Sequence, residues 1–240
     1  MRTLVVFLMT CLLTNAALTA SNTTPFFFLN TDYEWSVVPL NPVKEDARAQ
    51  SILDKFSRKI AAYSSVIADF TFNIENPDAG VKETQKGKLY MKGDKYRMEN
   101  KDFERRSDGA SVWTLFLYGD EGEVQVTDSS EDDGELSPQM LFSIYKKDFY
   151  AVFKEEAVED GKAVAVIDLT PKSKDIPYFK VRLFFEKATN MLVKAKVFEK
   201  SGTTFTFFLD NYQTNKELAD SFFVMKKADY AKYEWVDLRD

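Results

Sequence analysis

The chain has no histidine and a single cysteine, and each scarcity excludes a class of chemistry. Without histidine there is no Ser-His-Asp or Cys-His catalytic group, no histidine-ligated zinc and no imidazole general base. The one cysteine, Cys11, lies inside an apolar N-terminal run, so the rest of the chain has neither a disulfide nor a thiolate metal site. We therefore expect no metal and no cofactor.

Carboxylates are the remaining candidates for acid–base catalysis, and Asp102 and Glu104 lie two residues apart. On a strand this spacing is equally typical of a solvated face, and no nucleophile with a base accompanies the pair. We therefore expect a binding protein without catalytic residues.

Positive charge is also in short supply, because 32 Lys and Arg residues stand against 38 Asp and Glu residues and give a net charge of −6. Strong binding to nucleic acid or to an anionic membrane surface needs a basic patch, so the overall balance disfavours both. Hydrophobic residues make up 45% of the 240 residues, which is enough for an ordinary folded domain.

Residues 1–20 are typical of a secretory signal peptide. Arg2 precedes an apolar run over residues 4–13, which is too short to span a membrane permanently, and a stretch of mostly small residues follows it. The alternative is a lipoprotein cleavage box over residues 8–11, in which Thr10 is a poor fit. We expect the chain to be exported.

Residues 21–45 form an aromatic-rich arm, in which three phenylalanines follow Pro25 and are followed by Tyr33 and Trp35. This composition is too apolar for a plain linker. The arm either packs on the following domain as an extended segment, which we favour, or acts as a partner-binding or sheet-edge strand. The folded domain then spans residues 46–240.

Hydrophobic periodicity predicts one helix followed by many strands. Between residues 45 and 63, apolar side chains recur every three or four positions, which indicates an amphipathic helix. From Val66 to Glu75 the period changes to two, as in a half-buried strand. Later strand patterns with short turns indicate an antiparallel meander of about ten to eleven strands, large enough to curl, with helices to cover its concave side.

The turn at residues 93–94 is a Gly-Asp pair and predicts a two-residue β-hairpin, in which glycine supplies the positive φ. Pairing outward from this turn gives the partners Lys92 and Lys95, Met91 and Tyr96, Tyr90 and Arg97, and Leu89 and Met98. Because side chains alternate between faces, Leu89, Met91, Tyr96 and Met98 share one apolar face, which must be covered.

An acidic stretch over residues 128–135 suggests calcium, but the EF-hand register fails because Asp133 stands where glycine is required and Gln139 where glutamate is required. We expect a solvated loop. Ser137 then caps a helix that Pro138 begins. The sequence leaves open whether this second helix, rich in apolar residues, is ordinary core or a movable lid over an apolar ligand.

Several motifs in this order resemble the outer-membrane lipoprotein carrier (LolA-like) family, in its Bacteroidetes-type version. They are residues 87–99 (GKLYMKGDKYRME), 107–109 (SDG) leading to Trp113, 134–138 (GELSP), 145–149 (YKKDF), 178–183 (YFKVRL), 187–190 (KATN) and 236–239 (VDLR). The resemblance covers about residues 46–240, and the aromatic-rich arm has no counterpart in it.

The resemblance implies an α+β fold, an unclosed antiparallel half-barrel with a helical lid, whose concave apolar face receives the acyl chains of lipoproteins in the periplasm of a Gram-negative bacterium. It also implies the partners, namely acylated lipoproteins, an inner-membrane lipoprotein-releasing ABC transporter and an outer-membrane acceptor, with the protein itself a monomer. The same fold could instead sense envelope lipids or lipoproteins, or scaffold an envelope complex, without transport.

From this resemblance and from the apolar faces we expect the acyl chains to contact Phe70, Phe72, Leu89, Met91, Tyr96, Met98, Trp113, Met140, Leu141 and Ile144. Family members fasten the lid with an arginine before the first hairpin turn. Here the hairpin is one residue shorter, and the nearest candidate is Lys92, which cannot make a planar bidentate contact.

Overall fold

The computed structural model of the protein describes residues 46–129, 142 and 149–239. The chain divides into two units, Met1–Leu40 and Asn41–Asp240, and the description falls in the second. The predicted signal peptide and arm lie outside the described residues, as do most of the acidic loop and all of the second helix except Phe142.

Helix α1 spans Ala47–Ala61, within the range predicted from periodicity. Asp46 begins it, because the Asp46 side chain accepts hydrogen bonds from two backbone N–H groups of the first turn, as helix N-caps do. Three residues at helical spacing, Ala49, Leu53 and Phe56, are fully buried. They form the apolar stripe that packs the helix against the sheet.

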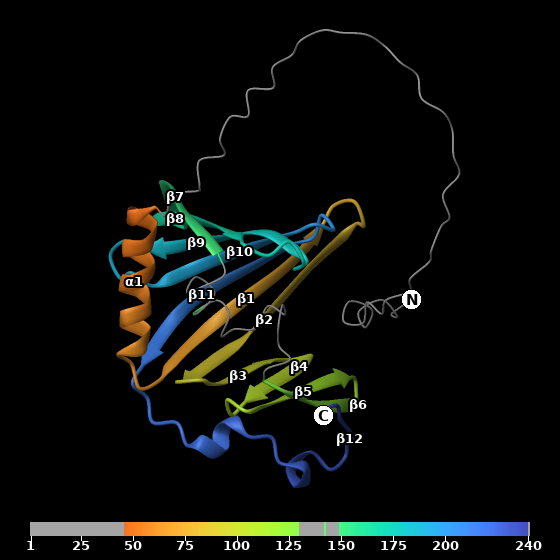
Figure 1. The fold of residues 1–240 in the computed structure, drawn as a ribbon. Coiled ribbons are helices and arrows are strands. Elements are labelled where there is room, and N and C mark those ends of the chain that lie inside the picture. The colour runs from red at the N-terminus through yellow and green to blue at the C-terminus, as the bar shows by residue number, and fades with distance from the viewer. Residues whose placement is uncertain (1–45, 130–141, 143–148, 240) are drawn as a thin grey trace, which may run out of the picture. The chain divides into compact units, whose positions relative to one another are not determined.

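Twelve strands form one sheet in the described part of the chain (Figure 1). Their order is β12-β6-β5-β4-β3-β2-β1-β11-β10-β9-β8-β7, so β12 and β7 are separate edges and the sheet is unclosed. Neighbouring strands are antiparallel except β12 and β6, which are parallel. The strands are β1 Val66–Asn76, β2 Val81–Lys92, β3 Lys95–Asn100, β4 Phe103–Ser107, β5 Ser111–Tyr118, β6 Glu121–Asp128, β7 Phe149–Glu159, β8 Lys162–Pro171, β9 Tyr178–Glu186, β10 Leu192–Glu199, β11 Thr204–Thr214 and β12 Glu234–Asp237.

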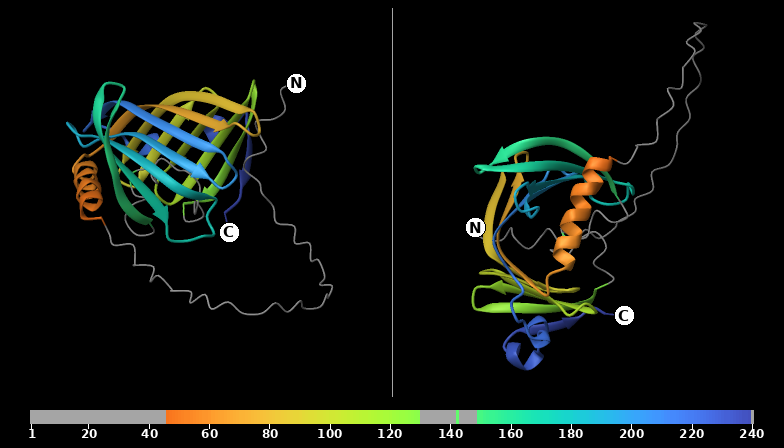
Figure 2. Two further views of the ribbon diagram at one scale, coloured as in Figure 1. Left: turned by 90° about the horizontal axis from the view of Figure 1, so that it is seen from above. Right: turned by 90° about the vertical axis from the view of Figure 1, so that its left-hand side faces the viewer.

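The sheet is strongly curved and α1 lies on its concave side (Figure 2). This confirms the predicted class, an unclosed antiparallel half-barrel with a helix over its concave face, although the strand number is twelve and not ten to eleven. The additional strands are β4, which has few apolar residues, and β12, which has only four residues.

The hairpin between β2 and β3 has the register predicted from its turn. Met91 pairs with Tyr96 and Leu89 with Met98, and the outward pairs also match the prediction. Gly93 has a φ of 58°, in the left-handed region that glycine adopts without strain. The sequence therefore determines this part of the fold locally.

Strands β1 and β11 join the two halves of the sheet, which the sequence places far apart. Phe72 pairs with Phe207 and Phe70 with Leu209, so the N-terminal strands β1–β6 and the C-terminal strands β7–β11 form one continuous surface. Long-range pairing of this kind has no signal in a local sequence pattern.

The face of the sheet that contacts α1 is called the inner face here, and it contains the main core. Its fully buried side chains come from α1 and from strands of both halves: Ala49, Leu53, Phe56, Ala68, Tyr96, Ile167, Leu169, Val181, Leu183, Phe185, Leu192, Ala195 and Val197. The opposite, outer face has smaller apolar clusters, one of them on β5 and β6 and another on β8 and β9.

The C-terminal segment, residues 215–239, lies on the outer face of the N-terminal strands (Figure 1). It contains two short 3₁₀ helices, η2 Asp220–Phe223 and η3 Lys227–Tyr230, before β12. Met225 of this segment is buried against Leu115, Val124 and Val126. The segment covers apolar residues that alternation directs away from the inner face.

Candidate functional site

An aromatic row crosses the joint between β1 and β11 on the inner face. The Phe72 ring stacks on Phe207 at a centroid distance of 4.4 Å and on Phe205 at 5.8 Å. Phe72 and Phe205 are only partly buried and pack at the margin of the main core. They give the inner face an apolar surface next to the fully buried residues.

Gly87 makes room for the next ring in this row. It pairs with Phe70 across β1 and β2, and a Cβ atom at position 87 would lie 2.5 Å from the Phe70 ring and 2.1 Å from the backbone oxygen of Glu99. Any side chain at Gly87 would therefore displace the Phe70 ring or separate β2 from β3.

The inner face continues over β2, β3 and β4. Leu89, Met91 and Tyr96 are buried, whereas Met98 and Phe103 are partly buried and pack against the same core. Alternation explains this arrangement, because the four residues of the predicted apolar hairpin face are i and i+2 neighbours or direct cross-strand partners.

Arg105 brings a positive charge to this apolar side. Arg105 of β4 follows the inward Phe103 by two residues, and its Nε donates a hydrogen bond to the Tyr96 hydroxyl at 3.1 Å. The tyrosine hydroxyl thus has a partner although the ring is almost completely buried. Arg105 places a guanidinium, which suits carbonyl and anionic oxygens, at the edge of an apolar surface.

Helix α1 covers the C-terminal half of the inner face. The Phe56 ring lies 5.1 Å from Phe185 of β9 and stacks on Phe142 at 5.6 Å. Two polar contacts also join α1 to this half of the sheet. Arg48 forms an ion pair with Glu156 of β7, and Lys59 Nζ donates a hydrogen bond to the Thr189 carbonyl at 2.5 Å. The aromatic row of β1 and β11 and the hairpin face lie beyond these contacts.

The structure brings six of the ten predicted acyl-contact residues onto one face and into one core. Phe70, Leu89, Met91 and Tyr96 are buried there, and Phe72 and Met98 are partly buried at its margin. Met140, Leu141 and Ile144 lie outside the described residues. Contact with acyl chains stays a prediction for all of them.

Trp113 lies elsewhere than expected. It faces the outer side of β5, where it packs with Leu115 and the C-terminal segment, and its cross-strand partner Arg106 also points outward. The register of β4 with β5 determines which face of β5 is the inner one. We therefore leave Trp113 out of the inner-face surface.

Lys92 also points away from the inner face, because it alternates with the buried Met91. Its Nζ donates to the Leu218 carbonyl at 2.7 Å and pairs with Asp220 at 2.8 Å. Lys95 contacts the other oxygen of the same carboxylate at 2.9 Å. These two lysines lower the pKa of Asp220 to about 2. Lys92 thus fastens the C-terminal segment in the described structure, and the expectation that it fastens a lid has no support from its position.

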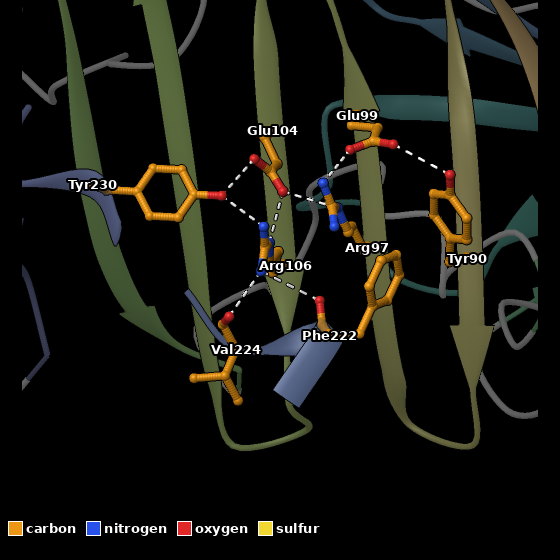
Figure 3. Close-up of polar contacts among 8 residues, drawn as sticks. All are labelled: Tyr90, Arg97, Glu99, Glu104, Arg106, Phe222, Val224 and Tyr230. Atoms are coloured by element: carbon orange, nitrogen blue, oxygen red, sulfur yellow. Dashed lines mark hydrogen bonds and ion pairs between the residues drawn. The ribbon is translucent and has the colours of Figure 1, made fainter. Parts of the chain in front are cut away.

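A compact polar network fixes the same segment to β3 and β4 (Figure 3). The Arg106 guanidinium donates to Glu104, to the carbonyls of Phe222 and Val224, and to the Tyr230 hydroxyl, with the last distance 2.6 Å. Tyr230 in turn donates to Glu104 at 2.9 Å. Burial, followed by the nearby Glu104 charge, raises the pKa of Tyr230 to about 12, so the hydroxyl stays a donor.

Arg97 completes this network from the neighbouring strand. It contacts Glu99 at 2.5 Å and Glu104 at 2.8 Å, and its guanidinium lies 4.5 Å from the centre of the Phe222 ring. The charges are paired with one another under the C-terminal segment. The network therefore holds the C-terminal segment in place. Among the described residues, no group of three or more Asp, Glu, His or Cys could hold a metal ion.

Sequence reasoning missed three inner-face residues, Phe205, Phe207 and Arg105. The alternation of Phe205, Phe207 and Leu209 with polar residues was a usable signal for a half-buried strand, but it does not reveal that β1 is the neighbour. No pattern distinguished Arg105 from Arg106, since β4 contains two adjacent arginines on opposite faces.

The unclosed curved sheet, with an apolar inner face and a helix across it, defines a class of fold, the half-barrel. The sequence profile described as outer membrane lipoprotein carrier protein LolA matches residues 61–226, and the chain belongs to this family. Members of the family are binding or carrier proteins of the bacterial envelope. A comparison with curated protein sequences gives no match.

Solved structures with a similar fold include a LolA superfamily protein from Nitrosomonas europaea, with 15% identity, a TM-score of 0.40, and coverage of 76% of this chain and 98% of that chain. The lipoprotein LppX from Mycobacterium tuberculosis has 12% identity, a TM-score of 0.41, and coverage of 71% and 98%. Among the described residues, no helix has both the length and the apolar character needed to cross a membrane.

Proposed function

We propose that this protein binds the acyl chains of lipoproteins on its inner face and carries them through the periplasm from the inner to the outer membrane. One observation supports the proposal most: four apolar side chains on the same face as the main core are only partly buried, namely Phe72, Phe205, Met98 and Phe103. Membership of the lipoprotein carrier family supports the same conclusion.

The physical basis is the transfer of methylene groups from water to this apolar surface. Each buried methylene contributes about 0.8 kcal/mol, so one long acyl chain contributes on the order of 10 kcal/mol if it is fully enclosed. A carrier must also release its cargo. Partly buried residues suit this need, because they accept a ligand without disruption of the fully buried core.

Arg105 adds a polar contact at this surface. Its guanidinium is directed at the Tyr96 hydroxyl within a largely apolar face, and guanidinium donors suit the carbonyl oxygens where acyl chains join a lipoprotein. The implied partners are an acylated lipoprotein, the inner-membrane ABC transporter that releases it and an outer-membrane acceptor. We propose that the carrier itself is a monomer.

A charge placed on the inner face tests this function. In Met98→Glu, a carboxylate would stand on the inner face opposite its cross-strand partner Arg105, and the charged pair, in place of an apolar side chain, opposes entry of an acyl chain. We expect uptake of a fluorescent acylated peptide to fall at least about tenfold, in accordance with a penalty above 1.4 kcal/mol.

The matched control is Thr84→Glu, which adds the same charge to an exposed, outward position of β2. Both variants must keep the circular dichroism spectrum of the original protein. Unchanged uptake by a folded Met98→Glu variant would refute the proposed surface. Absence of uptake by the unmodified protein would instead favour a scaffold function on the same fold.

A further inference from the structure

The outer face of the C-terminal strands has a patch of alternating lysine and phenylalanine. Lys196 and Phe198 point outward from β10, and Lys180, the register partner of Phe198, points outward from β9. Phe179 precedes Lys180 and is 50% exposed, which is unusual for so large an apolar ring. These four residues, Phe179, Lys180, Lys196 and Phe198, are called the Lys–Phe patch.

Cation–ring contacts hold the patch together. The Lys180 Nζ lies 4.2 Å from the centre of the Phe198 ring and 5.8 Å from that of Phe179, and the Lys196 Nζ lies 5.3 Å from Phe198. Contacts within about 6 Å are attractive, and here they orient ammonium groups and rings toward the same side of the sheet.

The lysines of the patch differ from the neighbouring cations in their charge partners. Arg182 has Asp168 at 2.6 Å, and Lys194 has Glu159 at 2.8 Å. No ion pair is formed by Lys180 or Lys196 with any described residue. Two of the four outward cations on β9 and β10 are thus neutralised, and the two in the Lys–Phe patch are not.

Further positive charge lies beside one end of the patch. Lys200 follows β10, and its Nζ donates to the Lys174 carbonyl at 2.6 Å, which brings the loop after β8 next to the turn after β10. Lys174 and Lys200 are both exposed, and neither forms an ion pair with a described residue. The acidic residues at this end include Asp175, Glu199 and also Asp78, whose carboxylate would lie 3.7 Å from a Cβ atom at Gly202. Four lysines, at positions 174, 180, 196 and 200, stand against these three carboxylates, although the whole chain has a net charge of −6.

We propose that the Lys–Phe patch docks the protein on the surface of a bilayer that contains anionic phospholipid. Ammonium groups without carboxylate partners suit lipid phosphates, and the exposed Phe179 ring beside Lys180 suits the boundary between headgroups and acyl chains. Charges farther than about 8 Å are largely screened at physiological ionic strength, so the negative net charge of the chain does not prevent local attraction. The proposal rests only on residues of the outer face and is independent of acyl binding on the inner face.

Flotation of the full chain with lipid vesicles tests the proposal. Vesicles of equal parts phosphatidylglycerol and phosphatidylcholine should bind the protein at physiological ionic strength, where the net charge of the chain is screened, and vesicles of phosphatidylcholine alone should not. The double variant Lys180→Glu with Lys196→Glu should lose at least about tenfold in partitioning, because each lysine contributes substantially at an anionic surface. Phe179→Ser should weaken binding to the mixed vesicles at low and at high salt alike.

The matched control is Lys55→Glu with Lys216→Glu, which makes the same change in net charge at exposed positions on α1 and after β11. Retained binding by this control, with loss in the patch variant, would support the proposal. Equal loss in both would show that only net charge matters and would overturn it. Failure of the unmodified protein to bind the mixed vesicles would also overturn it and would direct attention to an acidic protein partner, whereas acyl-peptide uptake would be unaffected by either result.

Discussion

Asp46 connects two segments that are 107 residues apart in the sequence. Its Oδ1 accepts the N–H groups of Arg48 and Ala49 at 2.8 and 3.2 Å, and its Oδ2 accepts the backbone N–H of Phe153 at 2.9 Å. The second contact falls at the β-bulge of β7, where the ladder with β8 shifts register. One carboxylate therefore caps α1 and also holds its first turn on the edge strand.

Replacement of Asp46 should separate these two tasks. Asp46→Ala removes both and should lower the free energy of unfolding by about 1–2 kcal/mol, in the range of helix N-caps. Asp46→Asn keeps one acceptor and should lose less, because asparagine also caps helices well. Urea unfolding at pH 7 measures both variants, and an Asp46→Ala protein as stable as the original would contradict the assigned role.

The pH dependence of this contact has a definite sign. The hydrogen bond from Phe153, followed by that from Ala49, lowers the pKa of Asp46 below its usual value of 3.8. A lowered pKa in the folded state means that the stabilisation is present above this unfolded value and is lost as the pH falls through the folded value. In Asp46→Ala, the free energy of unfolding should therefore fall less steeply as the solution is made more acidic. The same pH dependence in this variant and in the original protein would contradict the assignment.

Among the strands, the parts that local patterns determine were predictable and the parts that long-range pairing determines were not. The β2–β3 hairpin follows from its Gly-Asp turn and its alternation, and the predicted register is confirmed pair by pair. Strand β4 was missed because its outward residues, Glu104 and Arg106, are charged and satisfy one another. The direction of Trp113 also depends on β4, because the register of β4 with β5 places Trp113 opposite the outward Arg106.

The C-terminal segment depends on Arg106 for its position on the outer face. The Arg106 side chain is 11% exposed, and its removal would leave the Phe222 and Val224 carbonyls without this donor, whereas Glu104 would keep Arg97 and Tyr230. We expect Arg106→Ala to lower the free energy of unfolding by about 2 kcal/mol, through the loss of hydrogen bonds to a charged group. Amides of β12 should then exchange with solvent faster, and those of β8 and β9 should not.

Arg58→Ala serves as the comparison, because Arg58 is on α1 and contacts only the Asp54 carbonyl in the described structure. It should leave hydrogen exchange of β12 unchanged. Equal protection of β12 in the Arg106→Ala and original proteins would mean that the apolar contacts of Met225 and Trp235 suffice, and would contradict the fastening role of the polar network.

The two faces of the sheet differ in the residues that they present. The inner face has the core, the aromatic row and the hairpin side chains, whereas the outer face has the fastened C-terminal segment and the Lys–Phe patch. The overall class was predictable, because alternating strands with short turns indicate a curled antiparallel sheet. The joint between β1 and β11 was not, since its partners lie more than a hundred residues apart and only the folded structure brings them together.

The central claim is that this domain carries acyl chains, and native mass spectrometry of protein purified from the periplasm without detergent tests it most directly. The proposed function predicts a mass above that of the polypeptide, with lipid or an acylated lipoprotein recovered by organic extraction. Addition of an acylated peptide to stripped protein should restore the higher mass. A polypeptide mass without ligand, which stays unchanged when acylated peptide is added, would contradict the account.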